Sequence, residues 1–533
     1  MRMLTIVLLS GGIVAGQIGF TNHRVNKDAT AEVQNEQQIM VNPTDSANFV
    51  AVWRDFRVGY LQVGHAATFD RGQTWVVETL FVEPTYNWDS DPGLTVDANG
   101  NFFAIILSFN STSEPDGYFI FESTDKGRTW SAPRTVINQV PGVFEDKELI
   151  ACDRTSSPYQ GNLYVTWARF YAIDIMNTRS TNRGFNWSTP VPVSDASSSY
   201  QWPVPAVGPS GDLYIAWCAS NAIRFDRSTD GGLTFGTDRT IQSIYSMSRN
   251  LKGGLIATYS YPAMDVDITG GSYNGNIYIA FMDNGTDGFP DMYVTKSTDR
   301  GQTWSARRRI NDDPLNNRID QFHPWLTVDR TGCISVIFYD SRLDPNNMLC
   351  DVYMVQSTDG GNTWSNNIRV TTVSSDLRLK GNVLEPPDPT KPLAGMFAGH
   401  IGEYNGVAAS SRFNVVPIWT DTRNGNQDTY VGVFHYSGIE AVAGAGGSVR
   451  FSCKPNPVRD RLEIELMVEQ PGHYEICLYD GLGRRMKELF GGALLPGRHR
   501  LTSVGLSEMR PGVYFIEVES SSGTEHRKVV VQR

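Results

Sequence analysis

The octapeptide Ser123-Thr-Asp-Lys-Gly-Arg-Thr-Trp130 decides the fold, because close copies of it recur through most of the 533-residue chain. The six copies begin at Thr68, Ser123, Ser180, Ser228, Ser297 and Ser357. Their starts are 55, 57, 48, 69 and 60 residues apart. Self-similarity at such a period is typical of repeat architectures, in which each copy belongs to one supersecondary unit.

The octapeptide has the chemistry of a tight turn. Its Ser or Thr and Asp side chains accept hydrogen bonds from backbone N–H groups, and its Gly supplies a positive φ. The aromatic residue at the end packs under the turn. The six copies therefore predict structural staples, and the chemistry of the protein is expected elsewhere.

The same order of strands surrounds each copy. Around the sixth copy, four successive segments read as the strands of one blade: 323–329, 333–339, 350–356 and 363–370. Counting the apolar second strands gives seven units: 48–53, 102–107, 163–167, 213–217, 277–281, 334–338 and 414–419. The seventh unit has neither an octapeptide nor a fourth strand of its own.

An unassigned strand near the N-terminus, residues 21–26, offers the missing fourth strand. Closing the ring with it would remove an open sheet edge, which exposes unpaired backbone groups to aggregation. We therefore expect an all-β protein whose residues 17–437 form a β-propeller. Seven blades are favoured, and six blades remain the alternative.

Composition agrees with an all-β chain and excludes one class of partner. The sequence holds 50 Gly and 27 Pro, with 40% apolar and 19% charged residues, as expected for many short strands and turns. A formal charge of -11 provides no basic surface for phosphates, so no nucleic-acid partner is expected.

The N-terminal end of the chain predicts an export signal, and the C-terminal end predicts a second domain. Residues 1–16 combine a basic start with an apolar run and small residues, which predicts a signal peptide, and no transmembrane segment is expected in the mature chain. Residues 438–449 are small and predict a linker. Alternating apolar residues with Gly and Pro turns predict a small β-sandwich over residues 450–533.

Two resemblances add to these predictions. The motif S/T-x-D-x-G-x-x-W resembles the Asp box of sialidase-like, or BNR-repeat, propellers over residues 22–436. The landmarks Pro455-Asn-Pro457, Leu506 to Tyr514 and the terminal strand Lys528–Val531 resemble a type A C-terminal sorting domain of the type IX secretion system. This resemblance implies a secreted or outer-membrane surface-attached protein whose C-terminal domain engages that secretion machinery.

Three second strands end in the same Asp-x-Arg device, which is expected to point to the loop-rich face opposite the octapeptides. The three pairs are Asp55 with Arg57, Asp340 with Arg342, and Asp421 with Arg423. Because guanidinium groups bind carboxylates bidentately, the three arginines are candidates to converge on an anionic sugar. The alternative is a structural Asp–Arg turn that each blade repeats for its own packing.

The sialidase resemblance implies further roles at this face. Tyr404 beside Glu403 is the candidate nucleophile region, and Asp55, or Asp91 in its place, is the candidate acid. Trp88 and Trp325 are candidates for stacking on sugar rings. The chain departs from the family in showing no Arg-Ile-Pro motif before its first box.

The prediction for function is an exported propeller that binds or hydrolyses extracellular glycans, with chemistry of the exo-α-sialidase type if it is an enzyme. A non-catalytic carbohydrate-binding adhesin or a cell-surface scaffold is the alternative. We expect a monomer and no cofactor. Calcium is the alternative, since the acidic pairs Asp89 with Asp91 and Asp312 with Asp313 offer oxygen ligands, although neither pair has EF-hand spacing.

Overall fold

The computed structural model of the protein describes residues 17–532 apart from several gaps. The gaps are residues 60, 111–115, 171–173, 196–199, 255, 379–400, 413, 438–449, 460, 469–470, 481–484, 507–508 and 521–522. The predicted signal peptide and linker therefore lie outside the described residues. Phe20–Phe434 form one compact unit, and the described residues from His435 onward belong to a second.

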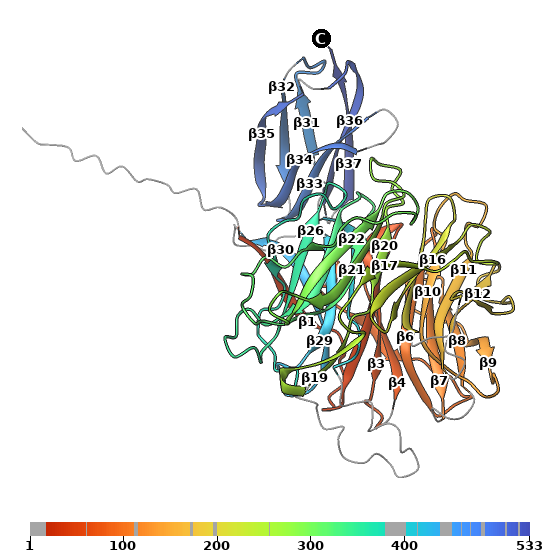
Figure 1. The fold of residues 1–533 in the computed structure, drawn as a ribbon. Helices are drawn as coiled ribbons and strands as arrows, with labels where there is room; N and C mark the ends of the chain where they lie inside the picture. Colours follow the sequence, from red (N-terminus) through yellow and green to blue (C-terminus); the bar gives the residue numbers. More distant parts are fainter. Residues whose placement is uncertain are drawn as a thin grey trace, which may run out of the picture. The chain divides into compact units, whose positions relative to one another are not determined.

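The described part of the first unit contains seven four-stranded sheets, blades 1 to 7 (Figure 1). Blade 1 is β2 (Gln34–Asn42), β3 (Asp45–Asp55), β4 (Gln62–Thr68) and β5 (Val76–Leu80). Blade 2 is β6 (Trp88–Val96), β7 (Phe102–Phe109), β8 (Gly117–Ser123) and β9 (Arg134–Asn138). Blade 3 is β10 (Phe144–Cys152), β11 (Leu163–Phe170), β12 (Asp174–Ser180) and β13 (Val191–Pro192).

The remaining blades repeat this order. Blade 4 is β14 (Tyr200–Val207), β15 (Leu213–Ala219), β16 (Ala222–Ser228) and β17 (Arg239–Ser243). Blade 5 is β20 (Ala263–Val266), β21 (Ile277–Asn284), β22 (Pro290–Ser297) and β23 (Arg308–Arg309). Blade 6 is β24 (Gln321–Val328), β25 (Ile334–Asp340), β26 (Asp351–Ser357) and β27 (Ile368–Arg369). Blade 7 is β28 (Gly406–Ser411), β29 (Asn414–Asp421), β30 (Asp428–Ser437) and β1 (Gln17–Arg24).

The inner strands close a ring around an axis. Contacts run from β2 to β6, and on through β10, β14, β20, β24 and β28 back to β2. The fourth strand of blade 7 is β1, so the N-terminal strand completes the last sheet. The predicted seven-bladed, all-β propeller is thus confirmed, with the ring closed as the unassigned strand suggested.

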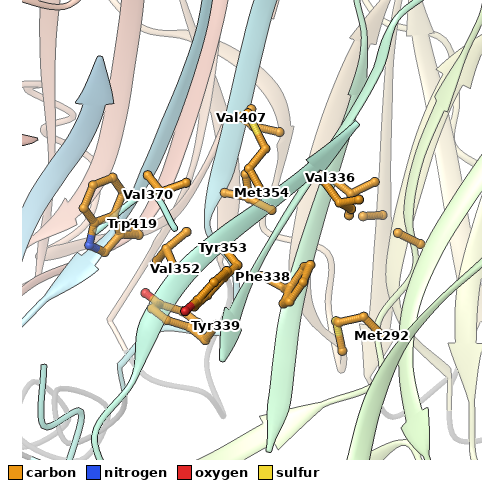
Figure 2. Close-up of a cluster of buried hydrophobic side chains, with 14 of the residues drawn as sticks. Met292, Val336, Phe338, Tyr339, Val352, Tyr353, Met354, Val370, Val407 and Trp419 are labelled. Carbon is orange, nitrogen blue, oxygen red and sulfur yellow. The ribbon is translucent and has the colours of Figure 1, made fainter. Parts of the chain in front are cut away.

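Apolar side chains on both faces of the strands form the core between blades. Figure 2 shows one cluster to which blades 5, 6 and 7 contribute, including Met292, Val336, Phe338, Val407 and Trp419. The second strands are buried along almost their whole length, because each sheet is covered by a neighbour on both faces. Such burial explains why they read as continuous apolar runs.

The six octapeptides form the same turn. In the second copy, Ser123 Oγ accepts the N–H of Gly127 at 2.9 Å, and Asp125 Oδ1 accepts the N–H of Thr129 at 2.9 Å. Gly127 has a φ of 82°, and a Cβ there would lie 2.5 Å from Val50 Cγ2 in blade 1. At Gly301, in the fifth copy, a Cβ would lie 2.2 Å from Phe225 in blade 4. Each turn is therefore pressed against the preceding blade.

The second unit is a β-sandwich, as predicted. One sheet has the order β31 (Arg450–Lys454), β32 (Arg461–Val468) and β35 (Gly497–Gly505). The other has the order β34 (Arg485–Leu494), β33 (Gly472–Asp480), β36 (Gly512–Ser520) and β37 (Gly523–Val531). Alternate residues of β32, including Leu462, Ile464 and Leu466, face a shared core, which is the pattern of a strand with one buried face.

None of the helices among the described residues has the length and apolar character needed to cross a membrane.

The closing strand gives a first prediction. Phe20 in β1 is 5% exposed and packs edge to face on Phe434 in β30. Phe20→Ala should lower the free energy of unfolding by about 3 kcal/mol, because it leaves a cavity at the joint of the ring. Leu315→Ala, at a side chain that is 66% exposed, should change it by less than about 0.5 kcal/mol. Urea titration of both variants checks this, and equal stabilities would contradict it.

Candidate functional site

Five inner strands lose their pairing register at equivalent points near the loop-rich end of the axis. The irregularities lie between Asn35 and Gln38, Ser90 and Gly93, Asp146 and Leu149, Gln201 and Val204, and Phe322 and Trp325. In each, one non-glycine residue has a positive φ: Glu36 (55°), Asp91 (48°), Lys147 (59°), Trp202 (55°) and His323 (49°). Such backbone costs on the order of 1–3 kcal/mol per residue and is concentrated at functional sites.

The same register places Tyr261 of blade 5 and Tyr404 of blade 7 at the corresponding points, two residues before Ala263 and Gly406. The seven equivalent positions are therefore occupied by seven side chains with little in common. We call Glu36, Asp91, Lys147, Trp202, Tyr261, His323 and Tyr404 the axial ring.

Charged groups make up one side of the axial ring. Lys147 Nζ lies 2.7 Å from Asp91 Oδ2, 2.9 Å from Glu403 Oε2 and 4.0 Å from Glu36 Oε1. Arg54 Nη1 lies 3.4 Å from the same Glu36 oxygen. Glu403 and Lys147 are the more accessible members, with side chains 19% and 10% exposed, so they form the open end of this cluster.

Burial and the neighbouring charges shift the pKa values of two of these carboxyl groups in opposite directions. Burial raises the pKa of Glu36 to about 8, although the neighbouring cations oppose the shift. Burial also opposes ionisation of Asp91, but Lys147 and Arg54 hold the pKa of Asp91 below its ordinary value. Burial would lower the pKa of Lys147, and the surrounding carboxylates instead raise it well above its usual range. Near neutral pH the cluster thus pairs a protonated Glu36 with an ionised Asp91.

Aromatic side chains make up the other side. Trp202 Nε1 donates to Glu403 Oε2 at 2.9 Å, and the Trp202 ring lies 4.4 Å from that of Tyr259. The centroid of the Trp325 ring lies 6.3 Å from the ring centroids of both Tyr261 and Tyr404. A cavity of about 20 Å³ lies among Lys147, Glu148 and these aromatic rings, which is room for one water molecule.

A hairpin inserted between blades 4 and 5 supports the aromatic side. It consists of β18 (Ser248–Leu251), the 3₁₀ turn η1 (Lys252–Gly254) and β19 (Ile256–Tyr259). At its tip, the fully buried Lys252 side chain binds Asp320 Oδ2 at 2.9 Å and Ser341 Oγ at 2.6 Å in blade 6. The hairpin therefore spans blade 5, and its last residue, Tyr259, stacks beside the axis.

Four of the sequence-predicted residues lie together in this region, and one of them is Asp91, the alternative candidate acid, which binds Lys147. Glu403 binds Lys147 and Trp202, while Tyr404 and Trp325 line the small cavity. Tyr404 is 7% exposed, and its hydroxyl donates to the carbonyl of Pro92 at 3.4 Å. Burial raises the pKa of Tyr404 well above its ordinary value. Glu403 and Tyr404 thus take different partners, although they are adjacent in the sequence.

The Asp-x-Arg devices lie elsewhere, each in its own blade. Asp55, Asp340 and Asp421 are fully buried. Each accepts a hydrogen bond from the following arginine's Nη2, at 2.6 Å for Arg57, 2.7 Å for Arg342 and 2.7 Å for Arg423.

Each arginine also reaches an outer group of its blade. Arg57 binds Glu78 of β5, Arg342 Nη2 lies 2.8 Å from Asn367 Oδ1 beside β27, and Arg423 Nη2 lies 3.0 Å from Asn22 Oδ1 of β1. Their partners lie toward the outer strands, away from the axis, and the three arginines share none of them. These contacts support the structural alternative, and the structure does not bring the arginines together.

Trp88 also lies away from the axial ring. Its side chain is 2% exposed and packs 5.7 Å from Phe109 in the core of blades 2 and 3.

The acidic pairs considered for calcium are occupied by protein groups. Asp91 forms a salt bridge with Lys147, and Asp89 accepts a hydrogen bond from the Ser108 hydroxyl. Asp312 forms a salt bridge with Arg342, and Asp313 forms one with Arg309. Among the described residues, no three His, Cys, Asp or Glu side chains are grouped so as to hold a metal ion.

Sequence reasoning did not single out Glu36 and Arg54. Both lie in blade 1 and belong to the buried cluster around Lys147. The available signal was weak: a Glu among four Gln or Asn residues at the start of an inner strand.

Comparison with known proteins finds a family for the second unit and a partial relative of the chain. Residues 454–532 match the family model for a secretion system C-terminal sorting domain. A curated sialidase of Paraclostridium sordellii is 29% identical over 156 residues, which are 28% of this chain and 36% of that protein. The match therefore spans about a third of the length of the curated relative.

Solved structures include sialidase-type propellers. A leech intramolecular trans-sialidase has a TM-score of 0.44 at 13% identity, covering 61% of this chain and 68% of the other. The intramolecular trans-sialidase of Ruminococcus gnavus has a TM-score of 0.44 at 13% identity, covering 60% of this chain and 93% of the other. The chain thus combines a seven-bladed propeller with a C-terminal sorting domain, which marks it for secretion or delivery to the cell surface.

The acidity of Glu36 gives a second prediction. Its pKa is raised in the folded state, so the folded protein keeps a proton that the unfolded chain releases above its ordinary value of 4.5. The contribution of Glu36 to stability is therefore lost as pH rises from about 4.5 to about 8. Glu36→Gln does not titrate, so it should gain stability over the wild type by up to about 1.4 kcal/mol per pH unit in this interval.

Thermal and urea unfolding of both proteins from pH 5 to pH 9 measures this difference. A difference that stays constant with pH would show that Glu36 is ionised throughout.

Proposed function

We propose that this exported propeller binds extracellular glycans at the loop-rich end of its axis, with Glu403, Lys147, Trp202 and Tyr259 at the centre of the site. The observation that carries the proposal is the hydrogen bond from Trp202 Nε1 to Glu403 Oε2, an oxygen that also binds Lys147. It joins an aromatic wall to a charged cluster at one partly exposed point.

This combination matches what a sugar presents. Sugar rings offer apolar C–H faces to aromatic side chains and hydroxyl groups to charged donors and acceptors. Small-molecule sites are typically apolar walls with a few well-placed polar groups. The cavity of about 20 Å³ is too small for a sugar ring. The ligand therefore binds at its mouth, where Glu403, Lys147 and Tyr259 are partly exposed.

The two comparisons supply the context for this proposal. The sorting domain brings the propeller outside the cell, where glycans of other cells and of secreted proteins are available. The partial match to a protein named sialidase favours a sugar among possible ligands.

Hydrolysis is the second candidate, and one observation favours it. Glycosidases place a protonated carboxyl group and an ionised carboxylate on either side of the bond that they cleave. Glu36 and Asp91 have these opposite states and share Lys147 as a neighbour. Both are nearly fully buried, so this role requires the cluster to open toward the substrate.

The sequence-based hypothesis of an arginine site remains a rival. It assigns sugar binding to Arg57, Arg342 and Arg423, helped by Asp340, Asp421, Trp88 and Trp325, with Asp55 as acid. Of these residues only Trp325 belongs to the axial site, so the two hypotheses predict different sensitive variants.

A third prediction separates them. The purified protein is screened on a glycan array, and the affinity for a retained glycan is then measured by calorimetry. Glu403→Gln and Tyr259→Ala should each weaken binding at least about tenfold, because they remove a charged hydrogen-bond partner and a stacking surface. Arg342→Gln, the matched variant at the rival site, should leave affinity unchanged.

Loss of binding in Arg342→Gln with normal binding in Glu403→Gln would favour the arginine site. Absence of any glycan ligand would reject the proposal in favour of a scaffold. In parallel, a panel of fluorogenic glycosides that includes sialosides tests hydrolysis, for which turnover must be lost in both Glu36→Gln and Asp91→Asn.

A further inference from the structure

The axis carries a second, larger cavity at its other end. Leu149, Val204 and Trp325 line both the small cavity under the axial ring and a cavity of about 430 Å³ beyond it. The larger cavity is surrounded by the ends of the inner strands of all seven blades. Its volume lies in the range of small-molecule sites.

The large cavity belongs to the octapeptide end of the propeller. Its lining includes Ser46 near the start of β3. The backbone carbonyl of the next residue, Ala47, accepts the N–H of Arg71 in the first octapeptide at 3.0 Å. Lys126 in the second octapeptide binds Asp45, the first residue of β3, at 2.7 Å. The cavity therefore lies at the face opposite the proposed glycan site.

Two arginines lie at equivalent turns on its wall. Arg154 follows β10 in the sequence Asp153-Arg-Thr155, and Arg330 follows β24 in the sequence Asp329-Arg-Thr331. In both turns the Asp accepts hydrogen bonds from the Thr, so the turns are built alike.

The two arginines differ in their partners. Arg330 Nε donates to the carbonyl of Ser410 at 3.1 Å. Arg154 makes no hydrogen bond and no salt bridge with any residue that the structure describes, although it is half-buried in the cavity wall. It interacts electrostatically with Asp265, whose oxygens already accept the N–H groups of Val266 and Val328, each at 2.8 Å.

The walls of the cavity combine apolar and polar groups. Val266, Ile268, Leu326 and Val328 line it, together with the hydroxyl groups of Thr269 and Thr327, the carboxylates of Asp265 and Asp329, and the second arginine, Arg330. A guanidinium group with open donors in such surroundings is matched by a carboxylate, which it binds bidentately. The rest of the matching ligand is an apolar body that fills the space along the axis.

We propose that the octapeptide end of the axial channel is a second binding site, which takes a small organic carboxylate with an apolar body and holds it through Arg154. The site is independent of glycan binding at the opposite end.

Calorimetry and saturation-transfer NMR on the full-length protein test this fourth prediction. The probe is naphthalene-1-carboxylate, and its neutral partner is naphthalene-1-carboxamide, which has the same apolar body. The carboxylate should bind at least tenfold more tightly than the amide. Arg154→Gln should remove that preference and leave the amide's affinity unchanged.

Two further variants keep the test specific. Ala98→Trp places a large ring at the mouth of the cavity, on a partly exposed turn, and should abolish binding of both probes. Arg128→Gln, at an exposed arginine on the same face outside the cavity, should leave both affinities unchanged. Equal affinity for the two probes, no saturable binding, or unaltered binding in Ala98→Trp would each overturn the proposal.

Discussion

The packing of each octapeptide turn on the blade before it is the contact on which the ring depends. Gly127 and Gly301 leave no room for a Cβ because side chains of the preceding blade fill that space. A blade by itself has two apolar faces and cannot be stable alone, so these seams convert seven marginal sheets into one core. Blade 7 has no octapeptide of its own, and Asn22 of β1 instead donates a hydrogen bond to the carbonyl of Val370, directly after the last strand of blade 6, at 2.9 Å.

Because the ring is rigid, it can hold strained backbone conformations at its axis. Glu36, Asp91, Lys147, Trp202 and His323 have positive φ values that the neighbouring strands impose. In this arrangement Lys147 lies among three carboxylates, and Trp202 donates a hydrogen bond to Glu403. The scaffold thus supplies the free energy that holds charges and aromatic rings at fixed separations.

Repetition in the sequence predicts the scaffold well and the site poorly. The octapeptides and the apolar second strands recur, so blade number, ring closure and the two domains were predictable. The Asp-x-Arg pairs also recur, and they prove to be strand-end contacts for the same reason. The axial ring is set by a backbone irregularity that has no residue signature, and its equivalent positions hold unlike residues, among them Glu36, Lys147 and Trp202. Glu403 and Tyr404 were found because they lie in a chemically rich loop before β28, and Asp91 and Trp325 because they lie in acidic or aromatic stretches that prove to be parts of inner strands.

The position of β30 has a mechanical consequence. This strand is the last of the propeller, and it lies between β29 and β1 in its sheet. A tether that holds the C-terminal unit at a cell surface would pull along β30. When a strand is pulled along its length, the hydrogen bonds on both of its sides are loaded together and resist the force in shear. An edge strand would instead lose its hydrogen bonds one after another. The N-terminal strand β1 would thereby help to hold β30 in its sheet when such a force is applied.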